Sequence, residues 1–469
     1  AQARRVGRVM RSGSHFLDKV LRHLRMGCGN SACAEPQHEV HELRRAQSEI
    51  HRSHDTPKFA LERSHVVIAS PAFEELAASL RQRLRCEDLP EGDGPAVSWE
   101  RFKSGDPNTR FHWRHLSGRR VVYLFDTVDQ SRLFEQLSLI QTLQGFPLPD
   151  GADAANKWKT YVEAGDYTWC RVGSLTVILP WFRPCQMERT SRWHFGEDGK
   201  WTNSNPKGQW LDIPTAQYFA RLLSTPGSVP PLPGPSGELD GMPLVPLWRP
   251  PLELLFIELH EEKPISHSVS DLGATIRCER FVPYFLDKFK SSPTSFPGAK
   301  STYVVFPDHG AYDRYHESVM QRLHLDPEHI LYINKTRVGE SVEQVQKLFF
   351  ELGSDMTGTK ESFVSSDHIL IIDDFTNSGS TLFGAVSLVH KLVKTDDKPA
   401  VTIFVSHLVA AYDPKVVAGL APKLKELGPS CRFCTTNSIP MTTKLLQTDP
   451  PNPQIKVYDV SDFIADLVM

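Results

Sequence analysis

Short apolar runs alternate with segments of helical periodicity along most of this chain, and this alternation limits its possible folds more than any other feature. Strands that are apolar on both faces are typical of parallel sheets covered by helices on each side. The sequence therefore predicts an α/β fold built from two tandem units with right-handed crossovers. We expect strands at 66–69, 121–125, 175–180, 252–259, 303–306, 330–333, 369–372 and 401–406. We expect helices at 73–84, 131–143, 215–223, 313–322, 342–352 and 382–392.

The length of 469 residues exceeds what one ordinary hydrophobic core accommodates, so two domains with extensions are expected. The N-terminal domain follows a basic extension, and a segment with nine prolines interrupts the strand–helix rhythm before the C-terminal domain. The strand at 252–260 could equally complete the first domain, and the last helix could pack back on it. We place the extension at 1–60, the domains at 61–224 and 252–469, and the Pro-rich insertion at 225–251.

Composition excludes several classes of protein. The net charge is -3, so nucleic acid is not an expected partner. No apolar run approaches the roughly 18 residues that a membrane-spanning helix needs, so we expect no membrane span. Among residues 1–25, seven Arg and Lys face only Asp18 as an acid. This basic segment is compatible with a cytoplasmic protein or with part of a mitochondrial or plastid targeting segment.

The cysteines do not predict a metal centre. Cys431 and Cys434 have metal-ligand spacing, as do Cys28 and Cys33, but neither pair has a neighbouring second pair or a His partner at zinc-finger spacing. We expect reduced structural or surface thiols.

One polar segment directly follows an apolar strand and carries the strongest chemical signal. Its small residues allow the backbone to approach an anion, and the N-terminus of the helix that follows adds positive potential. Two carboxylates at the strand end can accept hydrogen bonds from vicinal sugar hydroxyls. The sequence therefore predicts a sugar phosphate site formed by Asp373, Asp374, Phe375, Thr376, Asn377, Ser378, Gly379, Ser380 and Thr381.

This segment resembles the phosphoribosyl-pyrophosphate loop of the ribose-phosphate diphosphokinases, and four further segments follow the same family's order. The Lys335-x-Arg337 pair is similar to the family's flap, Pro307-Asp308 to its Pro-Asp-x-Gly segment, and His260 to the His of its Asp-x-His. The stretch 102–108 resembles the loop that faces ATP from a neighbouring subunit. The resemblance begins near residue 66, runs to the C-terminus, and is closest to the plant-type, phosphate-independent branch.

The resemblance implies two phosphoribosyltransferase-type domains, a homo-oligomer or larger assembly, and synthesis of 5-phosphoribosyl 1-diphosphate from ATP and ribose 5-phosphate. It implies catalytic roles for Lys335, Arg337 and His260, and Mg²⁺ held by His260 and Asp308. The resemblance also implies that Asp373, Asp374 and residues 376–381 bind the sugar phosphate. The ATP-binding positions implied are Phe102, Gly105, Asn108 and Arg189.

The sequence departs from the family pattern mainly on the ATP side. Ser104 and Glu258 each stand where the family has Asp, Lys263 where it has Gln, and Gln186 where one branch has Arg. Three hypotheses follow: an active diphosphokinase, a catalytically weakened relative acting as a structural or regulatory subunit, and a phosphoribosyltransferase.

Overall fold

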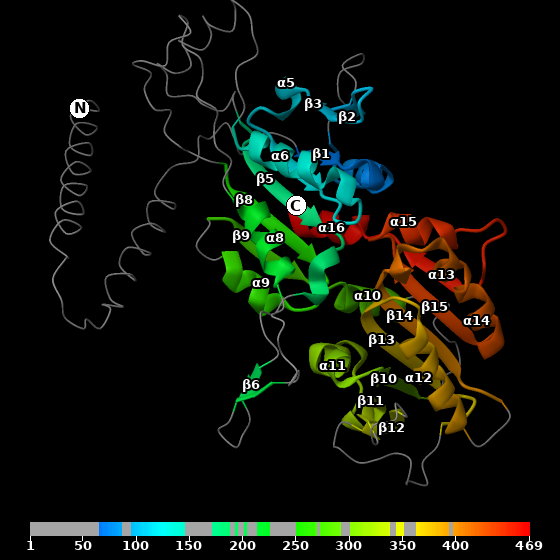
Figure 1. Cartoon of the computed structure of the whole chain (residues 1–469). Coiled ribbons are helices and arrows are strands. Elements are labelled where there is room, and N and C mark those ends of the chain that lie inside the picture. Colours follow the sequence, from blue (N-terminus) through cyan, green and yellow to red (C-terminus); the bar gives the residue numbers. More distant parts are fainter. Residues whose placement is uncertain are drawn as a thin grey trace, which may run out of the picture. The chain divides into compact units, whose positions relative to one another are not determined.

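The computed structural model describes most of the chain from residue 65 onward (Figure 1). All described residues belong to one compact unit, Phe59–Met469. The predicted extension at 1–60 and most of the Pro-rich insertion lie outside the described residues. The described ranges are 65–86, 95–145, 171–187, 193–195, 201–203, 213–225, 250–269, 273–291, 301–337, 344–350, 363–393 and 397–469.

The first sheet has five strands, all of them parallel. Its hydrogen-bonded order is β1 (His65–Ala69), β4 (Arg120–Leu124), β5 (Ser174–Leu179), β8 (Leu252–Ile257) and β9 (Thr275–Glu279). The helices along this part of the chain are α4 (Glu74–Arg83), α5 (Trp113–Leu116), α6 (Leu133–Leu143), α8 (Thr215–Ser224) and α9 (Glu262–Val269). Two antiparallel hairpins accompany them, β2 (Val97–Arg101) with β3 (Pro107–Phe111) and β6 (Trp193–Phe195) with β7 (Trp201–Asn203).

The second sheet has seven strands. Its order is β12 (Gln344–Phe350), β11 (Ile330–Arg337), β10 (Thr302–Phe306), β13 (His368–Thr376), β14 (Ala400–Leu408), β15 (Cys431–Thr436) and β16 (Ile455–Tyr458). All its pairs are parallel except β11 with β12. The helices of this half are α10 (Phe281–Ser291), α11 (His309–Leu323), α12 (Ser380–Lys391), α13 (Pro414–Ala418), α14 (Leu420–Leu427), α15 (Pro440–Thr443) and α16 (Ser461–Val468).

Burial on both faces explains why the strands are apolar throughout. In β4, Val121 and Tyr123 pack in the cluster that contains α6, whereas Val122 and Leu124 pack in the cluster that contains α4. Successive side chains of a strand point to opposite faces, so each strand supplies two cores. The predicted α/β architecture with helix-covered parallel sheets is confirmed, and Figure 1 shows helices over both sheets.

The helix predicted at 342–352 was wrong, because Gln344–Phe350 forms strand β12. Strand β11 continues beyond the predicted Ile333 to Arg337, and its extended edge pairs with β12 from Leu331 to Arg337. The run Val345, Leu348, Phe349 and Phe350 combines residues that favour strands, and an available partner strand outweighs a weak helical periodicity.

Strand β8 pairs with β5 and β9 in the first sheet. The last helix, α16, lies against α4, and its Phe463 and Ile464 share a core cluster with residues of both sheets. The single core cluster that holds Val67, Leu255, Val304 and Leu370 therefore joins the two sheets through the helices between them.

Cys431 and Cys434 lie on opposite faces of β15. Both are buried, and burial raises the pKa of each thiol to about 12. Two inert thiols that point to different cores do not form a metal site. The described helices include none long and apolar enough to cross a bilayer.

A buried polar cluster lies where β8, β14 and β15 end. The His407 ring is fully buried, with Nδ1 2.7 Å from Ser438 Oγ and Nε2 3.3 Å from the carbonyl oxygen of Glu258. A carbonyl only accepts, so Nε2 carries the proton and Nδ1 accepts from the Ser438 hydroxyl. The neutral ring thus satisfies both partners, and burial lowers the pKa of His407 to about 4.

This burial predicts acid sensitivity of the fold. His407 binds a proton near pH 6.5 in the unfolded chain but only near pH 4 in the folded chain. The free energy of unfolding is therefore unaffected by this residue above pH 6.5 and decreases as the pH falls from 6.5 to about 4. The loss amounts to about 3 kcal/mol. His407→Gln keeps a donor and an acceptor without a titrating group. Denaturant unfolding between pH 8 and pH 4 should show a steeper decline for the wild type than for this variant. Parallel declines would contradict the assignment.

Candidate functional site

The predicted acidic pair does not follow strand β13 but forms part of it. The strand continues to Thr376, with Asp373 paired to Val405 and Phe375 to His407 in β14. The backbone N–H of Val409 also donates to the Thr376 carbonyl. The predicted strand ends at Ile372, four residues short of the observed end. Because the acidic pair lies within the hydrogen-bonded strand, it is held more rigidly than a loop would hold it.

The turn between β13 and α12 is short and faces the N-terminus of that helix. Asn377 and Ser380 are exposed, whereas Gly379 is buried and its N–H lies 3.2 Å from Thr376 Oγ1. Ser378 Oγ lies 3.1 Å from Ser380 Oγ. Thr381 lies in the first turn of α12, so hydroxyls and helix N–H groups converge at one end of a twelve-residue helix. This is an arrangement that binds phosphate groups.

No residue with a side chain fits at position 379 without strain. The φ of Gly379, +74°, lies in the left-handed region, and a Cβ built there would meet the Phe383 ring at 2.5 Å. Phe383 is itself a buried residue of α12, packed in the core cluster of the second sheet, and cannot move away freely. The glycine therefore allows the turn to close over the first turn of the helix.

A cation that the sequence reasoning missed lies beside this turn. Lys423 of α14 donates to the carbonyl oxygen of Ser378 at 3.2 Å, and its Nζ lies 5.6 Å from the centre of the Phe383 ring. No motif marks this lysine, because it comes from a helix that is distant in the sequence and is brought here only by the sheet order.

Asp374 occupies the centre of a buried ionic cluster. Its Oδ2 lies 2.6 Å from Nδ1 of His260 and 2.8 Å from Nη1 of Arg314. Arg314 Nη2 also lies 3.2 Å from His260 Nδ1. Burial would raise the pKa of Asp374, but the hydrogen bond with His260 and the charge of Arg314 hold this pKa well below its usual range, and Asp374 in turn raises the pKa of Arg314.

Asp373 has a different environment. It is partly exposed and its Oδ1 accepts the N–H of Asp374 at 3.0 Å. Burial raises the pKa of Asp373, and the neighbouring charges of Asp374 and Asp308 raise it further. Asp308 is the N-cap of α11, with Oδ1 accepting the N–H of Ala311 at 3.0 Å.

The donors near Asp373 suit a hard divalent cation. Carboxylate oxygens are the ligands that Mg²⁺ prefers, and a cation would relieve the repulsion between Asp373 and Asp308. The described residues contain no group of three or more His, Cys, Asp or Glu side chains close enough to hold a metal. Mg²⁺ would therefore keep much of its water shell or share phosphate oxygens with a substrate.

Glu258 is turned into the protein. Its backbone has a φ of +51°, its Oε2 accepts the N–H groups of Phe281 and Val282 at 2.7 and 3.0 Å, and Tyr315 Oη donates to Oε1 at 2.8 Å. The residue is 2% exposed. Glu258 therefore caps α10 and does not face a substrate.

The predicted ATP-side residues lie on a separate hairpin. Phe102, Ser104 and Gly105 form the exposed turn between β2 and β3, and Asn108 is on β3. Ser104 Oγ donates to Asp106 at 2.8 Å. The base of the hairpin is anchored by the buried Glu135, whose carboxylate contacts Arg101, Arg132 and Thr109.

The remaining predicted residues are scattered. Lys335 and Arg337 lie on β11, which is separated from β13 by β10. Gln186 and Lys263 are exposed, on the short helix Arg183–Gln186 and on α9. Arg189 lies outside the described residues. The structure thus brings together His260, Asp373 and Asp374 and leaves the hairpin residues apart.

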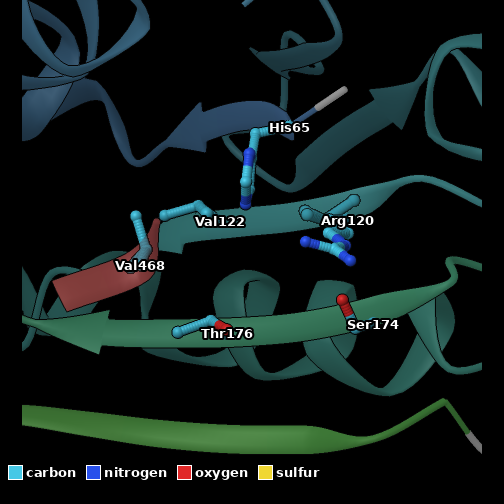
Figure 2. Close-up of a pocket in the computed structure, with 7 residues that line it drawn as sticks. His65, Arg120, Val122, Ser174, Thr176 and Val468 are labelled. Carbon is cyan, nitrogen blue, oxygen red and sulfur yellow. The ribbon is translucent and has the colours of Figure 1, made fainter. Parts of the chain in front are cut away.

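A hollow elsewhere in the molecule is not part of this site. Figure 2 shows His65, Arg120 and Ser174 around it, and these are the first residues of β1, β4 and β5. It therefore lies at the amino ends of the first sheet, whereas ligands of open α/β sheets bind outside the carboxyl ends.

Sequence comparison relates the chain to plant enzymes. No family model matches it. It is 23% identical over 377 residues to ribose-phosphate pyrophosphokinase 4 of Oryza sativa subsp. japonica, covering 79% of this chain and 86% of the rice protein. It is also 23% identical over 362 residues to the mitochondrial ribose-phosphate pyrophosphokinase 3 of Spinacia oleracea, covering 76% of this chain and 66% of the spinach protein.

Structural comparison agrees at the level of the fold. The phosphoribosylpyrophosphate synthetase of Mycobacterium smegmatis matches with a TM-score of 0.51 at 16% identity, over 86% of this chain and 97% of that one. This likeness shows the fold, two tandem phosphoribosyltransferase-type domains. The chain is thus a relative of the ribose-phosphate pyrophosphokinases, by sequence of the plant members and by fold of the bacterial synthetase.

Proposed function

We propose that the protein is a ribose-phosphate diphosphokinase, which transfers the diphosphate group of ATP to the anomeric hydroxyl of ribose 5-phosphate. The observation that carries the proposal is the turn 376–381 at the N-terminus of α12, directly beside the partly exposed Asp373. A phosphate group at that N-terminus would bring the ribose hydroxyls of the same molecule toward the carboxylate. The relationship to the pyrophosphokinases supports the same substrate pair.

In the proposed reaction the anomeric oxygen bonds to the β-phosphorus of ATP. The bond from that phosphorus to the oxygen bridging it to the α-phosphorus breaks, AMP leaves with that oxygen, and the hydroxyl proton is released. Such transfers need position and charge compensation rather than a covalent intermediate. Asp373 would accept hydrogen bonds from ribose hydroxyls, and the amides of 378–381 would hold the 5-phosphate.

Lys335 and Arg337 on β11 would supply the positive charge that offsets the negative charge of the transferring diphosphate group. Mg²⁺, when bound by Asp308 and His260, would neutralise phosphate oxygens of ATP. The hairpin that carries Phe102 would act on a neighbouring copy, because its turn is exposed and Phe102 is 55% exposed. We therefore also propose a homo-oligomer.

A second candidate function is a catalytically weakened subunit. The observation in its favour is Ser104, which stands in the exposed hairpin turn where the family has Asp and donates to Asp106 of the same turn. Binding of ribose 5-phosphate without turnover of ATP is what this alternative predicts.

The activity itself separates the two functions. We expect AMP formation from ATP and Mg²⁺ that depends on ribose 5-phosphate, measured by chromatography of the nucleotides. Asp373→Asn should lower kcat/KM by 10-fold or more, since about 1.5–3 kcal/mol is typical of a hydrogen bond to a charged group. Sugar-dependent AMP at the level of a protein-free control would contradict the diphosphokinase, and calorimetric binding of the sugar in that case would support the subunit.

Gly379→Ala should weaken binding of ribose 5-phosphate by about 10-fold, because left-handed backbone costs roughly 1–2 kcal/mol in any other residue and the new Cβ meets Phe383. Gly428→Ala is the matched control. Gly428 also has positive φ, +102°, but its Cβ would meet nothing within 4 Å. Isothermal titration with the sugar phosphate measures both. Equal affinities for the two variants would contradict a role of the turn in binding.

Lys423→Met should weaken binding of ribose 5-phosphate by about 3-fold and reduce its dependence on salt, because one cation beside the phosphate is removed. Lys425→Met on the same helix serves as the control. Titrations at two salt concentrations test this. Identical salt dependence in the Lys423 variant and the wild type would exclude a contribution from this lysine.

A further inference from the structure

The two carboxylates of the acidic pair, Asp373 and Asp374, differ in how far their oxygens are already engaged by protein groups. Asp374 uses both oxygens inside the protein. Oδ1 accepts the N–H of Phe375 at 2.9 Å, and Oδ2 contacts His260 at 2.6 Å and Arg314 at 2.8 Å. Its side chain is 4% exposed. A sugar hydroxyl could reach Asp374 only by displacing a buried ionic partner, which is costly.

Asp373, in contrast, is partly exposed, and its Oδ1 accepts the backbone N–H of Asp374 at 3.0 Å. Neighbouring residues of a strand point to opposite sides. The pair therefore presents one carboxylate to the partly exposed side and the other to the interior.

The short contact to Asp374 determines the proton position on His260. A nitrogen 2.6 Å from a carboxylate oxygen must carry the hydrogen, so Nδ1–H donates to Asp374. Arg314 Nη2 lies 3.2 Å from the same nitrogen, but a guanidinium group only donates hydrogen bonds. A protonated Nδ1 cannot accept one, so these two atoms form no hydrogen bond. Arg314 is thus held by Asp374, and in the neutral ring the lone pair resides on Nε2. A carboxylate on one imidazole nitrogen is the usual support for a metal on the other.

Arg314 is itself fixed by the cap of α10. The next residue, Tyr315, is fully buried and donates to Glu258, and the Arg314 guanidinium carbon lies 5.5 Å from the centre of its ring. Glu258 stands two positions before His260 and is bound to α10 and, through Ser406 Oγ at 3.1 Å, to β14. The same carboxylate therefore sets the start of the His260 segment and the position of Arg314 on α11.

We infer that Asp374 is a positioning residue that, together with Arg314, orients His260 toward a divalent cation, and that Asp373 is the one carboxylate of the pair that receives the sugar hydroxyls. The choice of sugar phosphate as ligand of Asp373 rests on the proposed function. The orientation of His260 by Asp374 does not.

Two isosteric variants separate the roles, Asp373→Asn and Asp374→Asn, each studied in the full chain. Titration calorimetry with ribose 5-phosphate alone should show a Kd raised 10-fold or more in Asp373→Asn and within about 3-fold of the wild type in Asp374→Asn. Electron paramagnetic resonance with Mn²⁺ alone should show affinity lowered about 10–100-fold in Asp374→Asn, the usual effect of losing such a support. A Kd for the sugar that rises equally in both variants would overturn the inference.

A spectroscopic measurement is independent of substrate. Nitrogen-15 NMR of the imidazole rings, with His260 assigned by His260→Gln and the ring neutral, should show the Nδ1–H form in the wild type and a shift toward Nε2–H in Asp374→Asn. Absence of the Nδ1–H form in the wild type would overturn the inference.

Arg314→Met serves if Asp374→Asn does not fold, and it should lower Mn²⁺ affinity while leaving sugar binding within about 3-fold. Sugar binding lost in Arg314→Met to the extent seen in Asp373→Asn would count against the separate roles. Should the wild type not bind ribose 5-phosphate at all, the proposed function fails, while the NMR and Mn²⁺ results still decide the role of Asp374.

Discussion

The buried carboxylate of Glu258 is the interaction that holds the candidate site in place. It receives two N–H groups of α10, the hydroxyl of Tyr315 on α11 and the hydroxyl of Ser406 on β14, while its carbonyl contacts His407. Four donors to one carboxylate offset much of the cost of burying it, although burial still raises its pKa. Elements of both sheets are tied together at one residue. Glu258 fixes the start of the segment that carries His260, and through Tyr315 it fixes the position of Arg314. Asp374 is held between His260 and Arg314.

This arrangement changes the meaning of one sequence departure. At the sequence level Glu258 counts as a loss on the ATP side, because the family has Asp there. In the fold it is a helix cap with both carboxylate oxygens engaged, so it says little about ATP. Under the proposed function, the change that would bear on nucleotide binding is Ser104, whose turn is exposed and whose hydroxyl donates to Asp106 of the same turn. The anchored base of that hairpin, built on Glu135, is consistent with a turn that still presents Phe102 outward.

The architecture was predictable because strands buried on both faces leave a direct pattern in the sequence, as β4 and β13 do. The turn 376–381 was predictable because small and hydroxylated residues between a strand and a helix are typical of phosphate-binding turns. Strand β12 was not, since its partner edge exists only once β11 extends to Arg337. Arg314 and Lys423 were missed because an arginine or lysine on a helix is normally solvated, and only tertiary packing brings them to Asp374 and Ser378. The distinction between Asp373 and Asp374 lies in hydrogen bonds that no motif encodes.

The proposed activity requires that the turn 376–381 and Asp373 form a site for a phosphorylated ribose. A crystal structure of the protein soaked with ribose 5-phosphate tests this requirement most directly. We expect the phosphate at the N-terminus of α12, within hydrogen-bond distance of the amides of 378–381, and a ribose hydroxyl on Asp373 with Asp374 still bound to His260. A sugar phosphate bound elsewhere, with this turn empty, would contradict the proposed site.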